Sequence, residues 1–379
     1  MKHLYILLTA FLLTGCIKRA SVEFAGTTPG IKNGVFIVKT AGDSTLYGEN
    51  IKDGKFTMAA KQLKYPDYYR MNITDNDNND THEPFEIYLE DGKYVIETQA
   101  GQLYKYPKIT SPSKIQDQLS AFYTLTDKLS LDVQNEIKQL KNDVKTKGNS
   151  LSPAAYTALL NKLTLAENNL RANNVNAFSQ FVKQYPNSVV SAHLMSKLNY
   201  EDDPVSFYAI YKTLTQEAKN TDEGKEIGEK LSHLVKLMPG VKAPSISGNT
   251  PDGKPFDPKA VNGKVILVDF WRASNTISRQ NHQRMKDIIS QFKNKNDLQV
   301  VSISLDTKAD WWKTAVNEDS IDWPQVSDLK GDDSPNAANW SVTTIPTYYL
   351  LDSKWNIIER NIDIGSVYLE TSDYLKKHH

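Results

Sequence analysis

The C-terminal third of the chain places a serine and a histidine at a spacing that could support nucleophilic catalysis. Ser278 and His282 are four residues apart, so on a helix their side chains share one face. A serine nucleophile also needs a carboxylate that orients the histidine. The nearest acid is Asp269, but it lies in an apolar run that we expect to be a strand. Because no nucleophile elbow or oxyanion motif accompanies these residues, a hydrolytic site is the weaker hypothesis.

The chain has one cysteine, Cys16. It follows a short positive region and an apolar run over 4–13 that is too short to span a bilayer as a helix. Residues 13–16, Leu-Thr-Gly-Cys, resemble the lipobox of bacterial lipoproteins, in which the cysteine is acylated and becomes the mature N-terminus. The resemblance implies a signal peptide over 1–15 and lipidation of Cys16. An ordinary signal peptide with a chance cysteine is the alternative.

The residues after the cysteine bear on location. They are Ile17, Lys18 and Arg19, with no aspartate next to the cysteine and no acidic cluster. By analogy with lipoprotein sorting rules, this favours a cell-envelope location at the outer membrane, facing the periplasm. The membrane contact is then the N-terminal lipid.

Composition excludes some function classes. Lys plus Arg and Asp plus Glu both number 45, so the formal net charge is zero. A nucleic-acid-binding protein normally carries an excess of positive charge, so we predict no nucleic-acid partner. No second apolar segment is long enough to span a membrane, and 379 residues suffice for two or three cores.

Residues 16–110 are expected to form a β-rich, sandwich-like domain. Apolar and polar residues alternate over 85–89 and 94–98, and Asp91-Gly92 between them is a strong signal for a tight hairpin. A second Asp-Gly occurs at residues 53–54. Several short strands with such turns predict a small antiparallel sandwich.

Residues 111–238 are expected to be a helical connector. Apolar residues recur at three- and four-residue steps over 119–144 and 159–170, and Ser152-Pro153 is a helix start between them. Two further helices are expected over 205–219 and 226–237. Such apolar stripes could receive a partner helix, but they more often form the core.

Residues 239–379 are expected to form an α/β domain. A nearly continuous apolar run over 265–271 is typical of a strand that is buried on both faces. A helix over 278–292 and a strand over 298–306 follow. Strand, helix and strand predict a right-handed parallel crossover.

Two motifs in this domain resemble the thioredoxin fold, and in particular its TlpA-like, thiol-disulfide oxidoreductase branch. Residues 268–271, Val-Asp-Phe-Trp, resemble the strand that enters the family's active site, and Ile345-Pro346-Thr347 resembles its cis-proline loop. The resemblance covers roughly residues 240–377. The order of the regions also resembles envelope lipoproteins that carry an N-terminal domain of unknown function ahead of a thioredoxin domain.

The resemblance also shows what this chain lacks. The family places its Cys-x-x-Cys pair at positions that here are Asn275 and Ser278. A thiolate is the nucleophile of thiol–disulfide exchange, so we predict no catalytic residue at this site. Asn275 is a suitable residue to cap the following helix. The resemblance makes Asp269 the family's buried acid, although a hydrogen-bonded core residue is the alternative.

The resemblance further implies a peptide groove. In the family, the backbone of the residue before the cis-proline pairs with an extended client segment, which needs no thiol. Here the groove would be lined by Trp271, Asn275, Ile345 and Pro346, although the loop could be kept for the fold alone. We therefore expect a redox-inactive module that binds an envelope polypeptide or an outer-membrane protein. The alternatives are an oxidoreductase whose partner supplies the cysteines and a structural subunit of an outer-membrane assembly.

No cofactor or metal is expected. The acidic stretch 75–80 with Glu86 has some spacing of a calcium loop, but its sixth position is Asp80 rather than glycine and strands are expected to flank it. The remaining histidines have no metal-ligand spacing.

Overall fold

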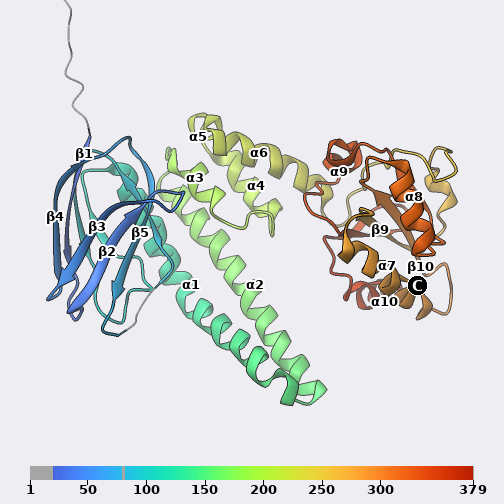
Figure 1. Ribbon diagram of the computed structural model, residues 1–379, viewed down its shortest axis with the longest axis horizontal. Coiled ribbons are helices and arrows are strands. Elements are labelled where there is room, and N and C mark those ends of the chain that lie inside the picture. The colour runs from blue at the N-terminus through green and yellow to red at the C-terminus, as the bar shows by residue number, and fades with distance from the viewer. Residues whose placement is uncertain (1–19, 79–81, 379) are drawn as a thin grey trace, which may run out of the picture. The chain divides into compact units, whose positions relative to one another are not determined.

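The computed structural model describes residues 20–78 and 82–378. The chain has an N-terminal β-domain, a helical connector and a C-terminal thioredoxin-like α/β domain, as the sequence predicts (Figure 1). The described residues form two compact units. The first extends to Leu198 and includes Leu214–Thr221, and the second contains Asn199–Thr213 and the chain from Asp222. The domain boundaries expected at 110 and 238 stay predictions.

Strands make up the β-domain. They are β1 (Ser21–Thr27), β2 (Asn33–Lys39), β3 (Thr45–Lys52), β4 (Lys55–Gln62), β5 (Asp67–Asp75), β6 (Phe85–Leu89), β7 (Gly92–Glu97) and β8 (Lys108–Thr110). Their order in one sheet is β6-β5-β2-β3-β4-β1-β7-β8. Residues from all eight strands share one hydrophobic core, so the sheet closes over its own buried face as a sandwich does.

Two expectations for this domain are wrong. The sandwich is not purely antiparallel, because β1 and β7 pair in parallel. Asp91-Gly92 does not form a hairpin, because β6 pairs with β5 whereas β7 pairs with β1 and β8, so the link crosses between layers. The Asp91 side chain accepts a hydrogen bond from the Ser21 amide at 2.8 Å instead. Asp53-Gly54, with positive φ at both residues, does connect β3 to β4.

The described residues form ten α-helices, and six of these lie in the connector. These are α1 (Lys114–Lys147), α2 (Pro153–Gln184), α3 (Val190–Ser196), α4 (Pro204–Thr213), α5 (Gln216–Asn220) and α6 (Asp222–Leu234). Ser152 caps α2 as expected, accepting from the Ala155 amide. The single helix expected over 205–219 is instead two, because Thr215 accepts a hydrogen bond from the Ala218 amide and starts α5. No helix of residues 20–78 and 82–378 has both the length and the apolar character needed to cross a bilayer.

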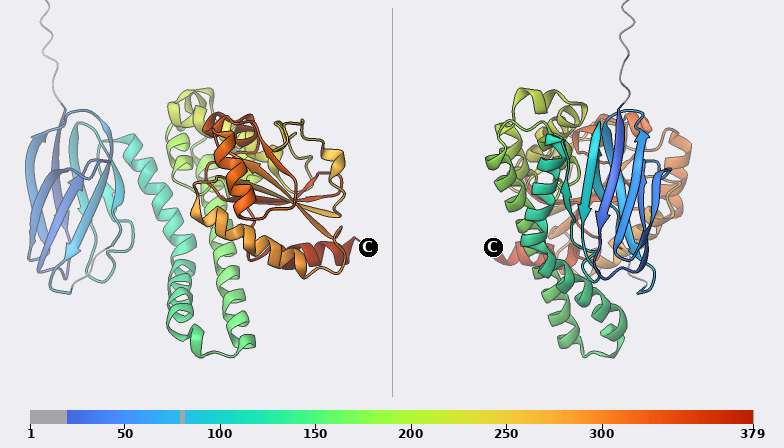
Figure 2. Two further views of the ribbon diagram at one scale, coloured as in Figure 1. Left: turned by 45° about the vertical axis from the view of Figure 1, so that its right-hand side comes forward. Right: turned by 90° about the vertical axis from the view of Figure 1, so that its left-hand side faces the viewer.

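The thioredoxin-like domain has a five-stranded sheet with the order β11-β10-β9-β12-β13. Its elements are β9 (Val265–Trp271), α7 (Thr276–Ser290), β10 (Leu298–Ser304), α8 (Ala309–Glu318), β11 (Gln325–Ser327), α9 (Pro335–Asn339), β12 (Thr347–Asp352), β13 (Ile357–Arg360) and α10 (Val367–Lys377). As predicted, β9 and β10 are parallel and α7 connects them. The core on one face contains residues of α7 and α10, and the core on the other contains residues of α9 (Figures 1 and 2).

Candidate functional site

The site begins where β9 ends and α7 starts. Asn275 caps α7, because its side-chain oxygen accepts a hydrogen bond from the Ser278 amide at 2.8 Å. The side-chain nitrogen of Asn275, Nδ2, donates to the backbone carbonyl of Ile345 at 3.4 Å. Since the Ile345–Pro346 peptide bond is cis, Asn275 joins the N-terminus of α7 to the cis-proline loop.

The cis-proline loop is accessible. Thr343 and Thr344 are exposed, and Ile345 and Pro346 are half-buried. The Thr347 hydroxyl donates to the carbonyl of Thr344 at 2.6 Å, which holds the turn. Within the described ranges, the Ile345 amide donates no hydrogen bond. A backbone donor is therefore available beside the start of α7.

Trp271 does not line this surface, so its predicted role in the groove is wrong. Its side chain is 0% exposed and packs in a cluster with Trp312, Ala315 and Val316. Its ring meets the ring of His282 edge-on, with centroids 4.6 Å apart. The physical reason is that the last residue of a fully buried strand still lies under the helix that follows.

Ser278 is also inaccessible. It is 0% exposed, and its hydroxyl has no hydrogen-bond partner among the described residues. The serine–histidine hydrogen bond that a hydrolytic site would use is thus not formed. The His282 ring faces carboxylates instead, with Nδ1 2.7 Å from Asp319 Oδ2 and Nε2 3.8 Å from Asp269 Oδ2.

Asp269 lies at the centre of the sheet. It is 0% exposed, and its Oδ2 accepts from the Ser302 hydroxyl at 2.7 Å. Ser302 in turn accepts from the Trp323 indole nitrogen at 2.9 Å. The other carboxylate oxygen of Asp269 has no partner in the described part of the chain. Asp269 is therefore a buried acid that is only partly satisfied.

The buried polar residues Asp269, Ser278 and His282 form one cluster. The sequence did not predict the residues on its solvent side, which are Arg279, Glu318 and Asp319. Arg279 donates to Asp319 Oδ1 at 2.6 Å and to Glu318 at 3.0 Å. Arg279 is one turn from His282 on α7, whereas Asp319 follows α8. The only available signal was the spacing of Arg279 and His282 on one face, because nothing in the sequence relates them to Asp319.

The charges of this cluster support each other. Burial disfavours a charge on His282, but the carboxylates of Asp269 and Asp319 more than offset it and raise the pKa of His282. Partial burial of Asp319 acts in the opposite direction to Arg279 and His282, which hold the pKa of Asp319 below its ordinary value. An imidazolium between two carboxylates is consistent with both directions.

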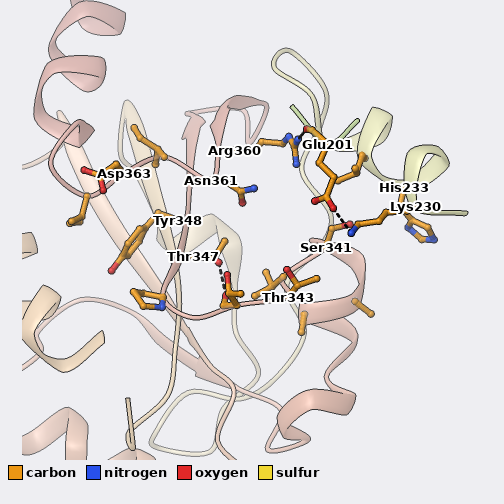
Figure 3. Close-up of a pocket in the computed structure, with 18 of the residues that line it drawn as sticks. Glu201, Lys230, His233, Ser341, Thr343, Thr347, Tyr348, Arg360, Asn361 and Asp363 are labelled. Carbon is orange, nitrogen blue, oxygen red and sulfur yellow. Dashed lines mark hydrogen bonds and ion pairs between the residues drawn. The ribbon is translucent and has the colours of Figure 1, made fainter. Parts of the chain in front are cut away.

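A cavity of about 1030 Å³ adjoins the cis-proline loop (Figure 3). In Figure 3, Lys230 and His233 of α6 lie on one side, Tyr348 and Asp363 lie on the other, and Thr343 lies below. All of the lining residues belong to the second unit. This cavity, and the part that α6 has in it, was not expected from the sequence.

The structure gives no support for two predicted features, the lipidated cysteine and the acidic stretch over 75–80. Cys16 lies outside the described residues. In the acidic stretch, residues 79–80 also lie outside them, and Glu86 contacts His193 and Lys197 instead. The part of the chain that the structure describes contains no cluster of three or more metal-ligating side chains.

Comparison with known proteins concerns the C-terminal domain. Residues 239–360 match the AhpC/TSA family. Similar solved structures include a thiol-disulfide oxidoreductase from Bacteroides fragilis, with 28% identity over 36% of this chain and 99% of that chain and a TM-score of 0.32. The thioredoxin domain of a Bacteroides vulgatus thiol-disulfide oxidoreductase has 26% identity over 36% of this chain and 98% of its own, with a TM-score of 0.34.

One similar structure extends further along the chain. A thioredoxin-like protein from Bacteroides caccae has 17% identity and covers 61% of this chain and 87% of its own, with a TM-score of 0.46. No curated protein matches the chain.

Proposed function

Starting from an AhpC/TSA-type, thioredoxin-like C-terminal domain, we propose that this protein is a redox-inactive module that binds a polypeptide at its cis-proline loop. One observation carries the proposal. An accessible cis-proline loop with an available backbone amide lies beside Asn275 and Ser278, at the start of α7. Neither of these residues can form a disulfide.

Binding at this loop requires only backbone groups. An extended client segment can accept from the Ile345 amide and donate to the Ile345 carbonyl, as in strand addition. The 3.4 Å contact from Asn275 to that carbonyl is long for a hydrogen bond. A client amide would therefore displace a weak interaction.

Redox chemistry is the part of the family's activity that we propose to be lost. The only cysteine is Cys16, which we expect to be lipidated. Wild-type protein should reduce insulin at the background rate. The double variant Asn275→Cys/Ser278→Cys, which supplies the two thiols to the same scaffold, is the positive control. Turnover by the wild type would instead support an oxidoreductase.

We also propose that the chain is anchored by a lipid on Cys16 in the outer membrane, facing the periplasm. The lipobox resemblance supports this. Three changes should follow from Cys16→Ser: loss of palmitate labelling, loss of signal-peptide processing at this site and a shift of the protein out of the outer-membrane fraction. An unchanged fraction would contradict the anchor.

Photo-crosslinking in cells tests the groove. The probe belongs at Thr344, which is exposed, and not at Asn275, whose side chain caps α7. A matched probe at Leu165 of α2, which is 60% exposed, reports on the helices. A discrete adduct only at Thr344 supports polypeptide binding at the loop. An adduct only at Leu165 would favour the structural subunit, in which the helices carry the contacts.

A further inference from the structure

The cavity beside the cis-proline loop has a second wall that the thioredoxin-like fold does not supply. This wall is α6, which packs against α4 in the same unit. Ile227, Leu231 and Leu234 are buried, and Glu226 and Glu229 are exposed and line the cavity. Because residues three apart on a helix are neighbours, these two carboxylates lie side by side.

Close packing fixes the position of α6. At Gly228, a Cβ atom would lie 2.1 Å from the Tyr211 hydroxyl of α4, so a larger residue there would displace the Tyr211 side chain from α6. On the thioredoxin side, Glu201 forms an ion pair with Lys230 of α6, and its carbonyl accepts a hydrogen bond from Arg360 of β13. The wall is therefore attached both to α4 and to the sheet.

The charges on this wall are unbalanced. Lys230 is engaged by Glu201 and by the ring of Tyr200, 5.8 Å from its ammonium. Across the described ranges, neither Glu226 nor Glu229 makes an ion pair. The carboxylates thus face the cavity without a bonded cation, although Lys230 is close enough to Glu226 to interact electrostatically.

The charges on the other surfaces of the cavity balance one another. The floor is made by uncharged residues of the cis-proline loop, Thr343, Thr344 and Pro346. Outside α6, the lining carries two cations, Arg284 and Arg360, and two anions, Glu201 and Asp363, and Arg360 donates to the Glu201 carbonyl. The excess negative charge of the cavity therefore lies on α6, and a positively charged side chain of a bound segment would be attracted there.

We propose that the polypeptide bound at the cis-proline loop directs a lysine or arginine side chain toward α6, where Glu226 and Glu229 receive it. This inference rests on the proposed function and adds the chemistry of the client. Opposite charges at a partly exposed interface set specificity and association rate more than affinity. The preference should weaken as salt rises, because a Debye length is about 8 Å at physiological ionic strength.

The test uses a positional-scanning library of synthetic nonapeptides and the purified full chain. Wild-type protein should select Lys or Arg at one position. A fluorescent peptide with lysine there should bind roughly twofold to fivefold more tightly than its glutamine counterpart. In Glu226→Gln/Glu229→Gln that preference should disappear, while the glutamine peptide binds as before.

A matched variant controls for net charge. Glu370→Gln/Asp373→Asn removes two carboxylates from α10, outside the cavity, and should keep the lysine preference. Binding without charge preference, or selection of acidic residues through Arg284, would overturn this inference and leave the proposed function standing. If no peptide binds and Thr344 gives no adduct, the proposed function fails and the inference fails with it.

Discussion

Each unit of the protein buries a histidine against a carboxylate, and the two clusters differ in how completely they are satisfied. In the first unit, His193 of α3 contacts Glu86 of β6 at 2.9 Å. The same carboxylate accepts from Tyr123 at 3.3 Å and lies 3.5 Å from Lys197. The ring of Tyr68 stacks on His193 at 3.4 Å. Both carboxylate oxygens of Glu86 have partners.

The cluster below α7 in the second unit is incomplete. His282 contacts Asp319, but His282 Nε2, Asp269 Oδ1 and the Ser278 hydroxyl have no hydrogen-bond partner within the described ranges. A buried polar group without a partner costs about 1–3 kcal/mol. Such groups concentrate where a site is kept for something other than stability.

The difference separates a cluster that ties two elements together from a cluster whose polar groups are only partly satisfied. Burial of Glu86 would raise its pKa, but His193 and Lys197 hold that pKa below its ordinary value, so the ionised Glu86 carboxylate ties β6 to α3 through its contact with His193. The second cluster contains Asp269 and Ser278, which the sequence resemblance places at the positions of the family's buried acid and second cysteine. We infer that this cluster retains the surroundings of thiol chemistry without the thiols.

The largest expected effect is on the satisfied cluster. Glu86→Gln should lower the free energy of unfolding of the first unit by about 3 kcal/mol, because breaking a buried pair leaves its partners uncompensated. All six tryptophans lie in residues 271–355, so fluorescence reports on the second unit. Hydrogen exchange of the β6 amides is therefore the measurement.

A surface pair in the same domain is the control. Glu97 pairs with Lys108 at 2.9 Å, and their side chains are 45% and 70% exposed. Glu97→Gln should change β6 exchange by less than about 1 kcal/mol. Equal effects of the two substitutions would remove the distinction between the clusters.

The next effect depends on pH. The pKa of His282 is raised in the folded protein, so its stabilising charge is fully present below the unfolded pKa of about 6.5 and is lost as the pH rises through the folded pKa. His282→Gln can still donate to Asp319 but lacks the charge. The stability difference from wild type should therefore be largest near pH 6 and shrink toward pH 9.

Tryptophan fluorescence during urea unfolding measures this difference, since Trp271 contacts the His282 ring. Asp319 has a lowered pKa and stays ionised across that pH range. A stability difference that grows with pH would mean that His282 is neutral in the folded protein.

The cap at the start of α7 gives a smaller effect. Asn275→Ala should destabilise the second unit by about 1 kcal/mol, because it removes the side-chain acceptor for the Ser278 amide. Asn275→Asp keeps that acceptor and adds a negative charge at a helix N-terminus, so it should restore stability. If Asn275→Ala had no effect on urea unfolding, residue 275 would not be acting as a cap.

Local patterns predicted much of the fold. The apolar run over 265–271 and the crossover after it became β9, α7 and β10 because each signal is contiguous in sequence. The hairpin predicted at Asp91-Gly92 was wrong because a turn signal does not indicate which strands pair with each other. Thr215 was missed as a cap because the apolar pattern continued through it.

The sequence predicted those features of the site that depend on a single segment of the chain. The role of Asn275 as a cap follows from its own segment, and the resemblance of residues 268–271 to a known strand indicated that Asp269 is a buried acid. The burial of Trp271, the partnership of His282 with Asp319 and the α6 wall depend on contacts between distant elements. No spacing in one sequence encodes those contacts.

The smallest effect is the most direct test of the incomplete cluster. The Ser278 hydroxyl is buried without a partner, so Ser278→Ala should change stability by less than about 0.5 kcal/mol or increase it slightly. Ser302→Ala is the matched variant, because that hydroxyl bridges Asp269 and Trp323. It should cost about 1–3 kcal/mol, since it leaves the indole N–H unpaired. Equal losses in urea unfolding would mean that the Ser278 hydroxyl is engaged, and the cluster below α7 would then be as completely satisfied at this position as the cluster around Glu86.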